Sequence, residues 1–186
     1  LSVGATRART AMLSAGGVLG SCAAGRQLAK GEDPKRLGAY GALAGLPAFA
    51  VVIFSAPVEA GWLVRFGAMG IGFGGGLFAV GTLFTAMRIE SNFIGLALGA
   101  WGAVQAAAAG VAMFFGGALR DIVNTLSSQG VLGEGLMDPS VAYSMVYHVE
   151  MLLLFLTLIA VGPLVKRSTS FSIAAPSTLG LTESRI

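Results

Sequence analysis

Charged residues are scarce in this chain of 186 residues. Lys and Arg number 12 and Asp and Glu number 9, so charged side chains make up 11% of the sequence, against about 25% in soluble domains. Hydrophobic residues make up 55%, and the mean hydropathy is +0.79. These values exclude a water-soluble globular domain and a disordered tail, and we expect a protein of the lipid bilayer.

Cysteine and histidine occur once each, as Cys22 and His148. A structural zinc site needs four ligands of these types, and a single thiol has no partner for an intrachain disulfide. The sequence also contains no recognisable arrangement of Ser, His and an acidic residue, and no paired carboxylates on one apolar run. We therefore expect neither a structural metal centre nor an enzyme.

The basic residues give a pI near 9.4, but they form no stripe interleaved with aromatic residues, as nucleic-acid binding would require. They lie in short connectors between apolar runs, so we expect contact with membrane lipids and no nucleic-acid partner. Leu1 is not a start methionine, and no charged segment precedes a cleavable apolar core. We expect this sequence to be part of a longer protein.

Five apolar runs predict five transmembrane helices, since a helix needs roughly 20 apolar residues to cross about 30 Å of hydrocarbon. The runs cover about residues 10–25, 37–58, 66–87, 91–119 and 140–165. An open β-sheet is excluded, because its edges would leave backbone groups unpaired in lipid and because no alternation of period two is present. The predicted fold is a single all-α membrane bundle over residues 1–186.

The distribution of Lys and Arg predicts the orientation of these helices. Eight basic residues fall on one side (Arg26, Lys30, Lys35, Arg36, Arg88, Lys166, Arg167 and Arg185) and four on the other (Arg7, Arg9, Arg65 and Arg120). The richer side should be cytoplasmic, which places the tail 166–186 inside and the connector 119–140 outside. That connector carries Ile122, Val123 and Leu126 at helical spacing, typical of an interfacial helix, although an ordinary solvated loop fits equally well.

Glycine is abundant, with 28 residues, and much of it recurs at a spacing of four. Membrane helices associate through close packing at small residues, so these positions predict helix-packing faces. A sharper alternative is that some faces receive a flat pigment ring or a partner helix. The pairs are Gly16/Gly20, Gly41/Gly45, Gly70/Gly74, Gly72/Gly76 and Gly95/Gly99, followed by Gly102, Ala106 and Gly110.

Residues 70–75 formally match the dinucleotide-binding pattern GxGxxG. That pattern requires a preceding strand, whereas here it lies within a predicted span and would bring a phosphate into hydrocarbon. We reject it. The five glycines between Gly70 and Gly76 predict instead a weak or irregular helix, as in transporter helices that break near the midplane.

Two ionisable residues, His148 and Glu150, lie within the last span, about 12–15 Å from its start at 1.5 Å per residue. Ionisable residues in a span indicate function. Their spacing of two points them to different faces, so they do not chelate one ion. His148 is a candidate ligand for the magnesium of a chlorin ring; the alternative is a hydrogen bond to a neighbouring helix. Gln105 and Trp101 are further polar candidates in the bundle, while Thr82 and Thr85 should bond to their own helix.

Several segments carry a family resemblance. They are residues 65–67 (Arg-Phe-Gly), 71–78 (Ile-Gly-Phe-Gly-Gly-Gly-Leu-Phe), 80–83 (Val-Gly-Thr-Leu), 96–106 (Leu-Ala-Leu-Gly-Ala-Trp-Gly-Ala-Val-Gln-Ala) and 147–150 (Tyr-His-Val-Glu). With them, the chain resembles the PucC/LhaA family, the bacteriochlorophyll-delivery branch of the major facilitator superfamily. The resemblance implies a twelve-helix protein of the photosynthetic inner membrane, of which these would be the last five helices.

The resemblance also implies an assembly factor for light-harvesting complexes that handles bacteriochlorophyll while docked on antenna polypeptides and the reaction-centre core. The alternatives are a small-solute transporter of the same superfamily and a structural subunit of the photosynthetic core. For the first function we expect a hydrophobic crevice beside the third and fifth spans to hold the chlorin, with Trp101 or Phe73 against the ring. The remaining candidates are His148, Glu150 and Gln105 for pigment, and Gly72, Gly74, Gly76, Gly95, Gly99 and Gly102 for helix or partner contact.

Overall fold

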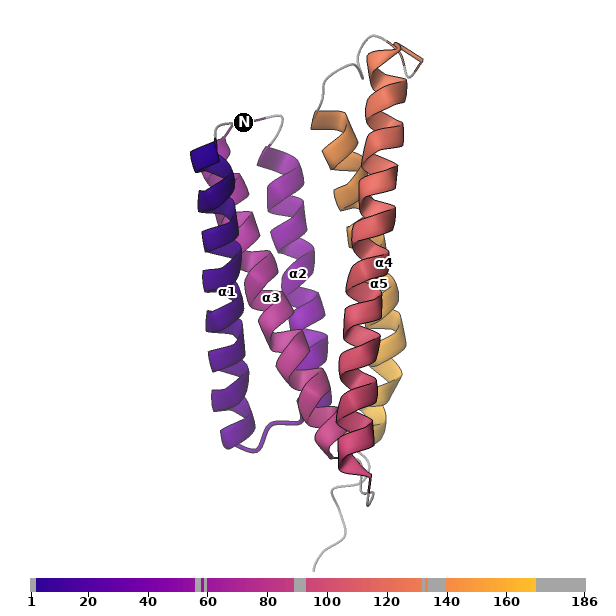
Figure 1. Cartoon of the computed structure of the whole chain (residues 1–186). Helices are drawn as coiled ribbons and strands as arrows, with labels where there is room; N and C mark the ends of the chain where they lie inside the picture. The colour runs from indigo at the N-terminus through magenta and orange to yellow at the C-terminus, as the bar shows by residue number, and fades with distance from the viewer. Residues whose placement is uncertain are drawn as a thin grey trace, which may run out of the picture.

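The computed structural model describes residues 3–55, 58, 60–88, 93–131, 133 and 140–169. Five α-helices account for almost all of them, as the sequence predicts. They run alternately down and up the long axis of the molecule (Figure 1). Their bounds are α1 Val3–Ala29, α2 Pro34–Ser55, α3 Gly61–Met87, α4 Ile94–Ser128 and α5 Ser140–Thr169.

Four of these helices are long and apolar enough to cross a membrane: α2, α3, α4 and the Val141–Pro163 part of α5. The chain is thus a multi-pass membrane protein. The prediction of a span within 10–25 is confirmed as a helix but not as a candidate span, because the 27-residue α1 also contains Arg7, Arg9 and Arg26. These three cations lower the mean hydropathy of the helix.

The end of the fourth span is the boundary at which the structure differs most from the prediction. Helix α4 continues from 119 to Ser128 and takes up the first part of the predicted outward connector. Of the apolar set there, Val123 is 6% exposed, whereas Ile122 is 58% exposed. The helical alternative is therefore confirmed for this segment. Most of the tail, residues 170–186, lies outside the described residues.

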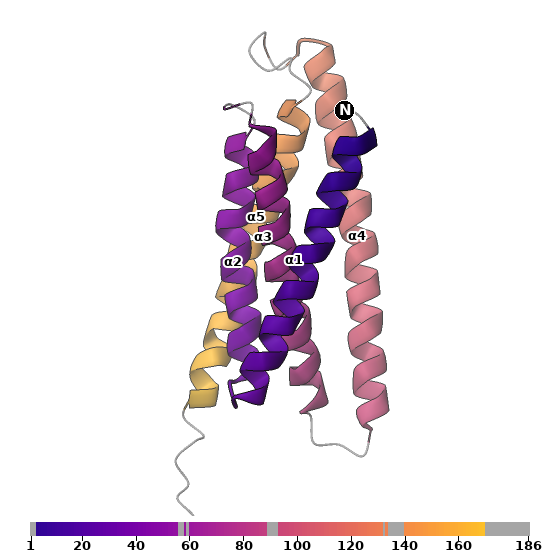
Figure 2. The same ribbon diagram turned by 90° about the vertical axis from the view of Figure 1, so that its left-hand side faces the viewer.

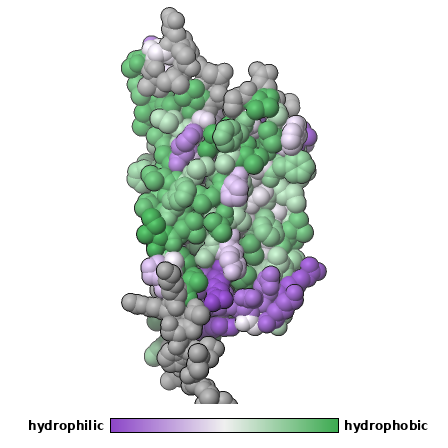
Figure 3. Space-filling model, turned by 180° about the vertical axis from the view of Figure 1, so that it is seen from behind, coloured by the Kyte–Doolittle hydropathy of each residue, from purple (hydrophilic) through white to green (hydrophobic). Residues whose placement is uncertain are grey.

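The alternation of the helices separates the basic residues into two groups. One end of the bundle carries the end of α1, the start of α2 and the end of α3, and hydrophilic residues gather at this end beneath a largely hydrophobic face (Figure 3). The basic residues there are Arg26, Lys30, Lys35, Arg36 and Arg88, together with Lys166 and Arg167 in the last turns of α5, whereas Arg7, Arg9, Arg65 and Arg120 lie toward the other end. The structure thus groups the basic residues at two ends as the sequence predicts, and the cytoplasmic side of the richer end stays a prediction.

Helix α3 lies between α1 and α2 in both views (Figures 1 and 2) and contacts both extensively. Its contact with α1 is made through glycine on both sides. A Cβ atom added at Gly16 would overlap the Met69 carbonyl, one at Gly20 the Phe73 carbonyl, and one at Gly72 the Leu13 carbonyl. The two helices approach backbone to backbone, which only residues without side chains permit.

The contact between α3 and α2 uses other glycines. A Cβ at Gly41 would lie 2.6 Å from the Gly74 carbonyl oxygen, and a Cβ at Gly81 would lie 2.7 Å from the Gly38 nitrogen. At 100° per residue, Gly74 and Gly81 lie on nearly the opposite side of α3 from Gly72 and Gly76. The expectation of an irregular third helix was wrong: α3 is helical throughout Gly61–Met87, because its glycines are enclosed by two neighbours.

Helices α4 and α5 form the other side of the bundle. Helix α5 packs on α2, where the rings of Tyr147 and Phe49 are 6.1 Å apart. Helix α4 packs on α5, with the guanidinium of Arg120 lying 5.0 Å from the centre of the Tyr143 ring. Contact between α4 and α3 is smaller. Helices α4 and α5 are thus joined to the glycine-packed layer mainly through the contact of α5 with α2.

The two faces of α3 predict a sharp difference between neighbouring glycine substitutions. Gly72→Ala should lower the free energy of unfolding by about 1–3 kcal/mol, because the new methyl group overlaps the backbone of α1. Gly75→Ala is the matched control: a Cβ there meets nothing within 4 Å, and the better helix propensity of alanine should raise stability by about 0.5–1 kcal/mol. Unfolding in mixed micelles, followed by circular dichroism, measures both; equal effects would contradict this packing.

Candidate functional site

The glycines of α4 differ from those of α3 in having no neighbour. A Cβ atom added at Gly95, Gly99, Gly102 or Gly110 would meet nothing within 4 Å. These positions are three to eight residues apart and share one side of the helix. We call them the open face of α4. The predicted contact positions therefore divide: Gly72, Gly74 and Gly76 are filled by α1 or α2, whereas Gly95, Gly99 and Gly102 are not filled by any described residue.

Large apolar side chains accompany these glycines along α4. Leu96 and Met113 are each 73% exposed, a degree that a soluble protein avoids in a continuous patch. In a membrane protein, such a helix contacts lipid or other transmembrane helices. The most exposed large apolar residues of α4 are Leu96, Val104, Val111, Met113, Phe114, Phe115 and Ile122.

His148 lies on an exposed face of α5. Its Nδ1–H donates a hydrogen bond of 2.7 Å to the carbonyl oxygen of Ser144, one turn earlier. Because a carbonyl oxygen can only accept, this bond places the proton of the neutral ring on Nδ1 and leaves the Nε2 lone pair free. The exposed residues Leu152 and Ile159 follow on the same side at helical spacing, so the imidazole projects from an apolar surface.

Glu150 does not share this surface. It is half-buried, and its spacing of two from His148 directs it to another side of α5. Tyr147, on the face that meets α2, contacts Phe49. His148 and Glu150 thus lie on different sides of α5.

Trp101 holds α4 against α3. Its indole N–H donates to the Thr82 hydroxyl over 3.3 Å, and Thr82 in turn donates to the Phe78 carbonyl of its own helix over 2.9 Å. Thr85 likewise bonds to Gly81 of its own helix, so the predicted roles of both threonines are confirmed. Gln105 follows Trp101 by one turn and is half-buried.

Phe73 belongs to the packed interior. It lies against the buried cluster of Ala24, Leu37 and Leu77. Its backbone also forms part of the contact with Gly20. The ring is therefore occupied by packing between α1, α2 and α3.

The predicted pigment residues lie at different depths in the bundle. Next to His148, Tyr147 contacts Phe49 of α2, whereas Trp101 contacts Thr82, which lines a cavity with Gly38 of α2. Positions 38 and 49 are about 16 Å apart along α2 at 1.5 Å per residue. The structure therefore does not bring Trp101 and His148 to one crevice.

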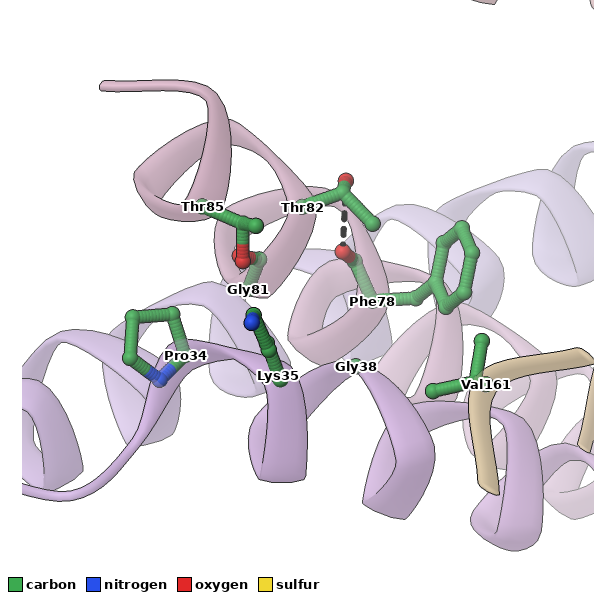
Figure 4. A pocket seen from close by; sticks show the side chains of 8 residues that line it. All are labelled: Pro34, Lys35, Gly38, Phe78, Gly81, Thr82, Thr85 and Val161. Atoms are coloured by element: carbon green, nitrogen blue, oxygen red, sulfur yellow. Dashed lines mark hydrogen bonds between the residues drawn. The ribbon is translucent and has the colours of Figure 1, made fainter. Parts of the chain in front are cut away.

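A cavity of about 140 Å³ does lie beside α3 and α5, where the sequence predicts a crevice, with α2 as its third wall (Figure 4). The aromatic residue that lines it is Phe78, not Phe73. Sequence reasoning did not identify Phe78 or the lining residues Lys35 and Val161. The only signal for them is Gly38, where a Cβ atom would have only Phe78 Cδ2, at 4.0 Å, within contact distance.

Residues 1–169 match the protein family described as PUCC protein. A protein of Rhodobacter capsulatus described as "Uncharacterized protein in puhA-bchM intergenic region" is 42% identical over 98% of this chain. Proteins named PucC from Cereibacter sphaeroides and Rhodovulum sulfidophilum are 41% and 47% identical over 89% and 66% of the chain, respectively.

These relatives are considerably longer than the present chain. The matched regions cover 39% of the Rhodobacter capsulatus protein, 35% of the Cereibacter sphaeroides protein and 27% of the Rhodovulum sulfidophilum protein. No solved structure matches the chain significantly.

The bond between Trp101 and Thr82 predicts a measurable contribution to the attachment of α4. Trp101→Phe should lower the free energy of unfolding by about 0.5–1 kcal/mol, because one interhelical hydrogen bond is lost. Trp62→Phe is the matched control, since Trp62 is exposed and contacts only its own helix neighbour Phe66 among the ring pairs of the structure. Mixed-micelle unfolding measures both variants; equal losses would show that the indole bond contributes nothing.

Proposed function

The chain belongs to the PucC family, a family linked to light-harvesting complex formation, and from this premise we propose that it takes part in assembling antenna complexes in a photosynthetic membrane. In this proposal the five helices are the final part of a twelve-helix facilitator-type protein. Antenna polypeptides and the reaction-centre core are its partners, and bacteriochlorophyll is its cargo.

The observation that carries the pigment part of the proposal is the hydrogen bond from His148 to Ser144. Histidines that bind metal ions commonly donate the second ring N–H to a backbone carbonyl, which fixes the tautomer and makes the other nitrogen a better ligand. Nε2 of His148 meets this condition. The magnesium of bacteriochlorophyll supplies an open axial position for such a nitrogen, and exposed apolar residues such as Leu152 would contact the macrocycle.

The open face of α4 supports the partner part of the proposal. In lipid, helices associate where small residues allow close approach, and α1, α2 and α3 use their glycines in this way. Gly95, Gly99 and Gly102 offer the same chemistry with no described residue opposite them. We propose that a single-span antenna helix packs there.

Apolar open surfaces favour this function over movement of a small polar solute. A solute pathway needs polar groups that line a passage. The cavity between α2, α3 and α5 is lined largely by apolar groups, and the exposed side chains of α4 and α5 named above are hydrophobic. The exposed side chains of α4 and α5 suit a chlorin ring and transmembrane helices.

The pigment proposal predicts that His148→Ala lowers the bacteriochlorophyll bound by the purified full-length protein at least fivefold and removes the absorption shift of the bound pigment. The reason is the loss of the axial nitrogen. Leu152→Ala, on the same exposed side of α5 and 59% exposed, is the matched control and should retain most of the pigment. Absorption spectroscopy after purification measures this, and an unchanged spectrum in His148→Ala would overturn the ligand role.

The partner proposal predicts that the double substitution Gly95→Leu and Gly99→Leu lowers co-purification of antenna polypeptides at least threefold, because two leucines hold the incoming helix away. Gly25→Leu is the control: it also lies in open space, but on α1. Quantitative mass spectrometry of the purified complexes provides the measurement. Undiminished recovery from a folded double variant would show that antenna helices bind elsewhere.

A further inference from the structure

We propose that the cavity between α2, α3 and α5 binds an acyl chain of an anionic phospholipid, whose phosphate meets the ammonium group of Lys35. The cavity is lined by Pro34, Lys35, Gly38, Phe78, Gly81, Thr82, Thr85 and Val161. It lies where α2 begins and α3 ends, which is the end of the bundle that carries most of the basic residues. The proposal does not depend on pigment handling.

The wall of the cavity is suited to hydrocarbon. Phe78 and Val161 contribute apolar side chains, and Gly38 and Gly81 contribute none. The hydroxyl groups of Thr82 and Thr85 donate to carbonyl oxygens of α3 over 2.9 and 2.8 Å. Because these hydroxyls are bonded within their own helix, the threonines can present methyl groups to the cavity, and a polar guest would gain few partners there.

The volume of the cavity limits what can enter. At about 140 Å³, it is well below the roughly 300–1,000 Å³ of typical small-molecule sites. A chlorin macrocycle is too large, whereas part of a flexible acyl chain fits. In a bilayer, phospholipid chains are the abundant source of such hydrocarbon.

Lys35 supplies the charge that selects an anionic headgroup. Its side chain points from the start of α2 toward Thr85 near the end of α3, at the rim of the cavity (Figure 4). Its backbone N–H donates to the Asp33 carboxylate over 3.0 Å, but no ion pair joins its ammonium group to a residue that the structure describes. The group is therefore available to a phosphate.

The surroundings strengthen this selection. At this end, five basic residues of α1, α2, α3 and their connectors (Arg26, Lys30, Lys35, Arg36 and Arg88) stand against Glu32 and Asp33, and the last turns of α5 add Lys166 and Arg167. Basic pockets between transmembrane helices attract anionic lipid headgroups, and each cation near the membrane surface adds to the attraction. The apolar wall of the cavity thus suits the acyl chain, and Lys35 at its rim suits the anionic headgroup.

Titration of the purified full-length protein with phosphatidylglycerol or phosphatidylcholine, followed by native mass spectrometry, tests the charge. Lys35→Gln should weaken binding of phosphatidylglycerol about fivefold, the effect of one cation near an anionic surface, and leave phosphatidylcholine unchanged. Lys30→Gln is the matched control, because Lys30 is exposed at the same end but does not line the cavity. Equal effects of the two substitutions would overturn the role of Lys35.

Filling the cavity tests the acyl chain. Val161→Phe should weaken binding of both lipids at least fivefold. Gly38→Ala fills the cavity from the opposite wall, where its Cβ atom would have only Phe78 Cδ2, at 4.0 Å, within contact distance. If Val161→Phe lowers the unfolding temperature, lipid binding by Gly38→Ala is the test of the cavity. Unchanged binding in the folded filling variants would overturn the cavity as the site, even where Lys35→Gln weakens phosphatidylglycerol binding.

Discussion

The close backbone contact on both sides of α3 is the constraint on which the bundle depends. Lipid surrounds apolar side chains as favourably as protein does, so burial of hydrocarbon does little to hold transmembrane helices together. Close van der Waals contact must do so instead. Gly72 and Gly76 provide it toward α1, and Gly74 and Gly81 provide it toward α2. Helix α5 then packs on α2, and α4 packs on α5.

This order of packing divides the molecule into a closed and an open part. Helices α1, α2 and α3 use their small residues on one another, which leaves these faces with no room for a further partner. Helices α4 and α5 keep a glycine face and a histidine with a free Nε2 outside the packed layer. The open face of α4 and His148 of α5 therefore lie on the two helices that make the fewest contacts with the rest of the bundle. The packed layer of α1, α2 and α3 supports these two helices through α2.

Much of this arrangement follows from sequence because charge and glycine spacing act locally. The order of the helices, the division of Lys and Arg between two ends, and the self-bonded Thr82 and Thr85 are all predictable. The glycines that contact a neighbouring helix cannot be predicted in this way. Gly72 and Gly99 both lie in apolar, glycine-rich sequence, but α1 lies opposite Gly72 and no described residue lies opposite Gly99. For the same reason, sequence placed Phe73 in the crevice, although the fold puts Phe78 there.

The pairing of α1 with α3, instead of with the adjacent α2, has a consequence for biosynthesis. Helix α1 carries three arginines and does not qualify as a span by hydropathy, and its best partner is made only after α2 has been synthesised. During translation, Gly16 and Gly20 of α1 therefore meet Met69 and Phe73 only after α3 enters the membrane. The backbone contacts of Gly16 and Gly20 are thus completed only when α3 has been made.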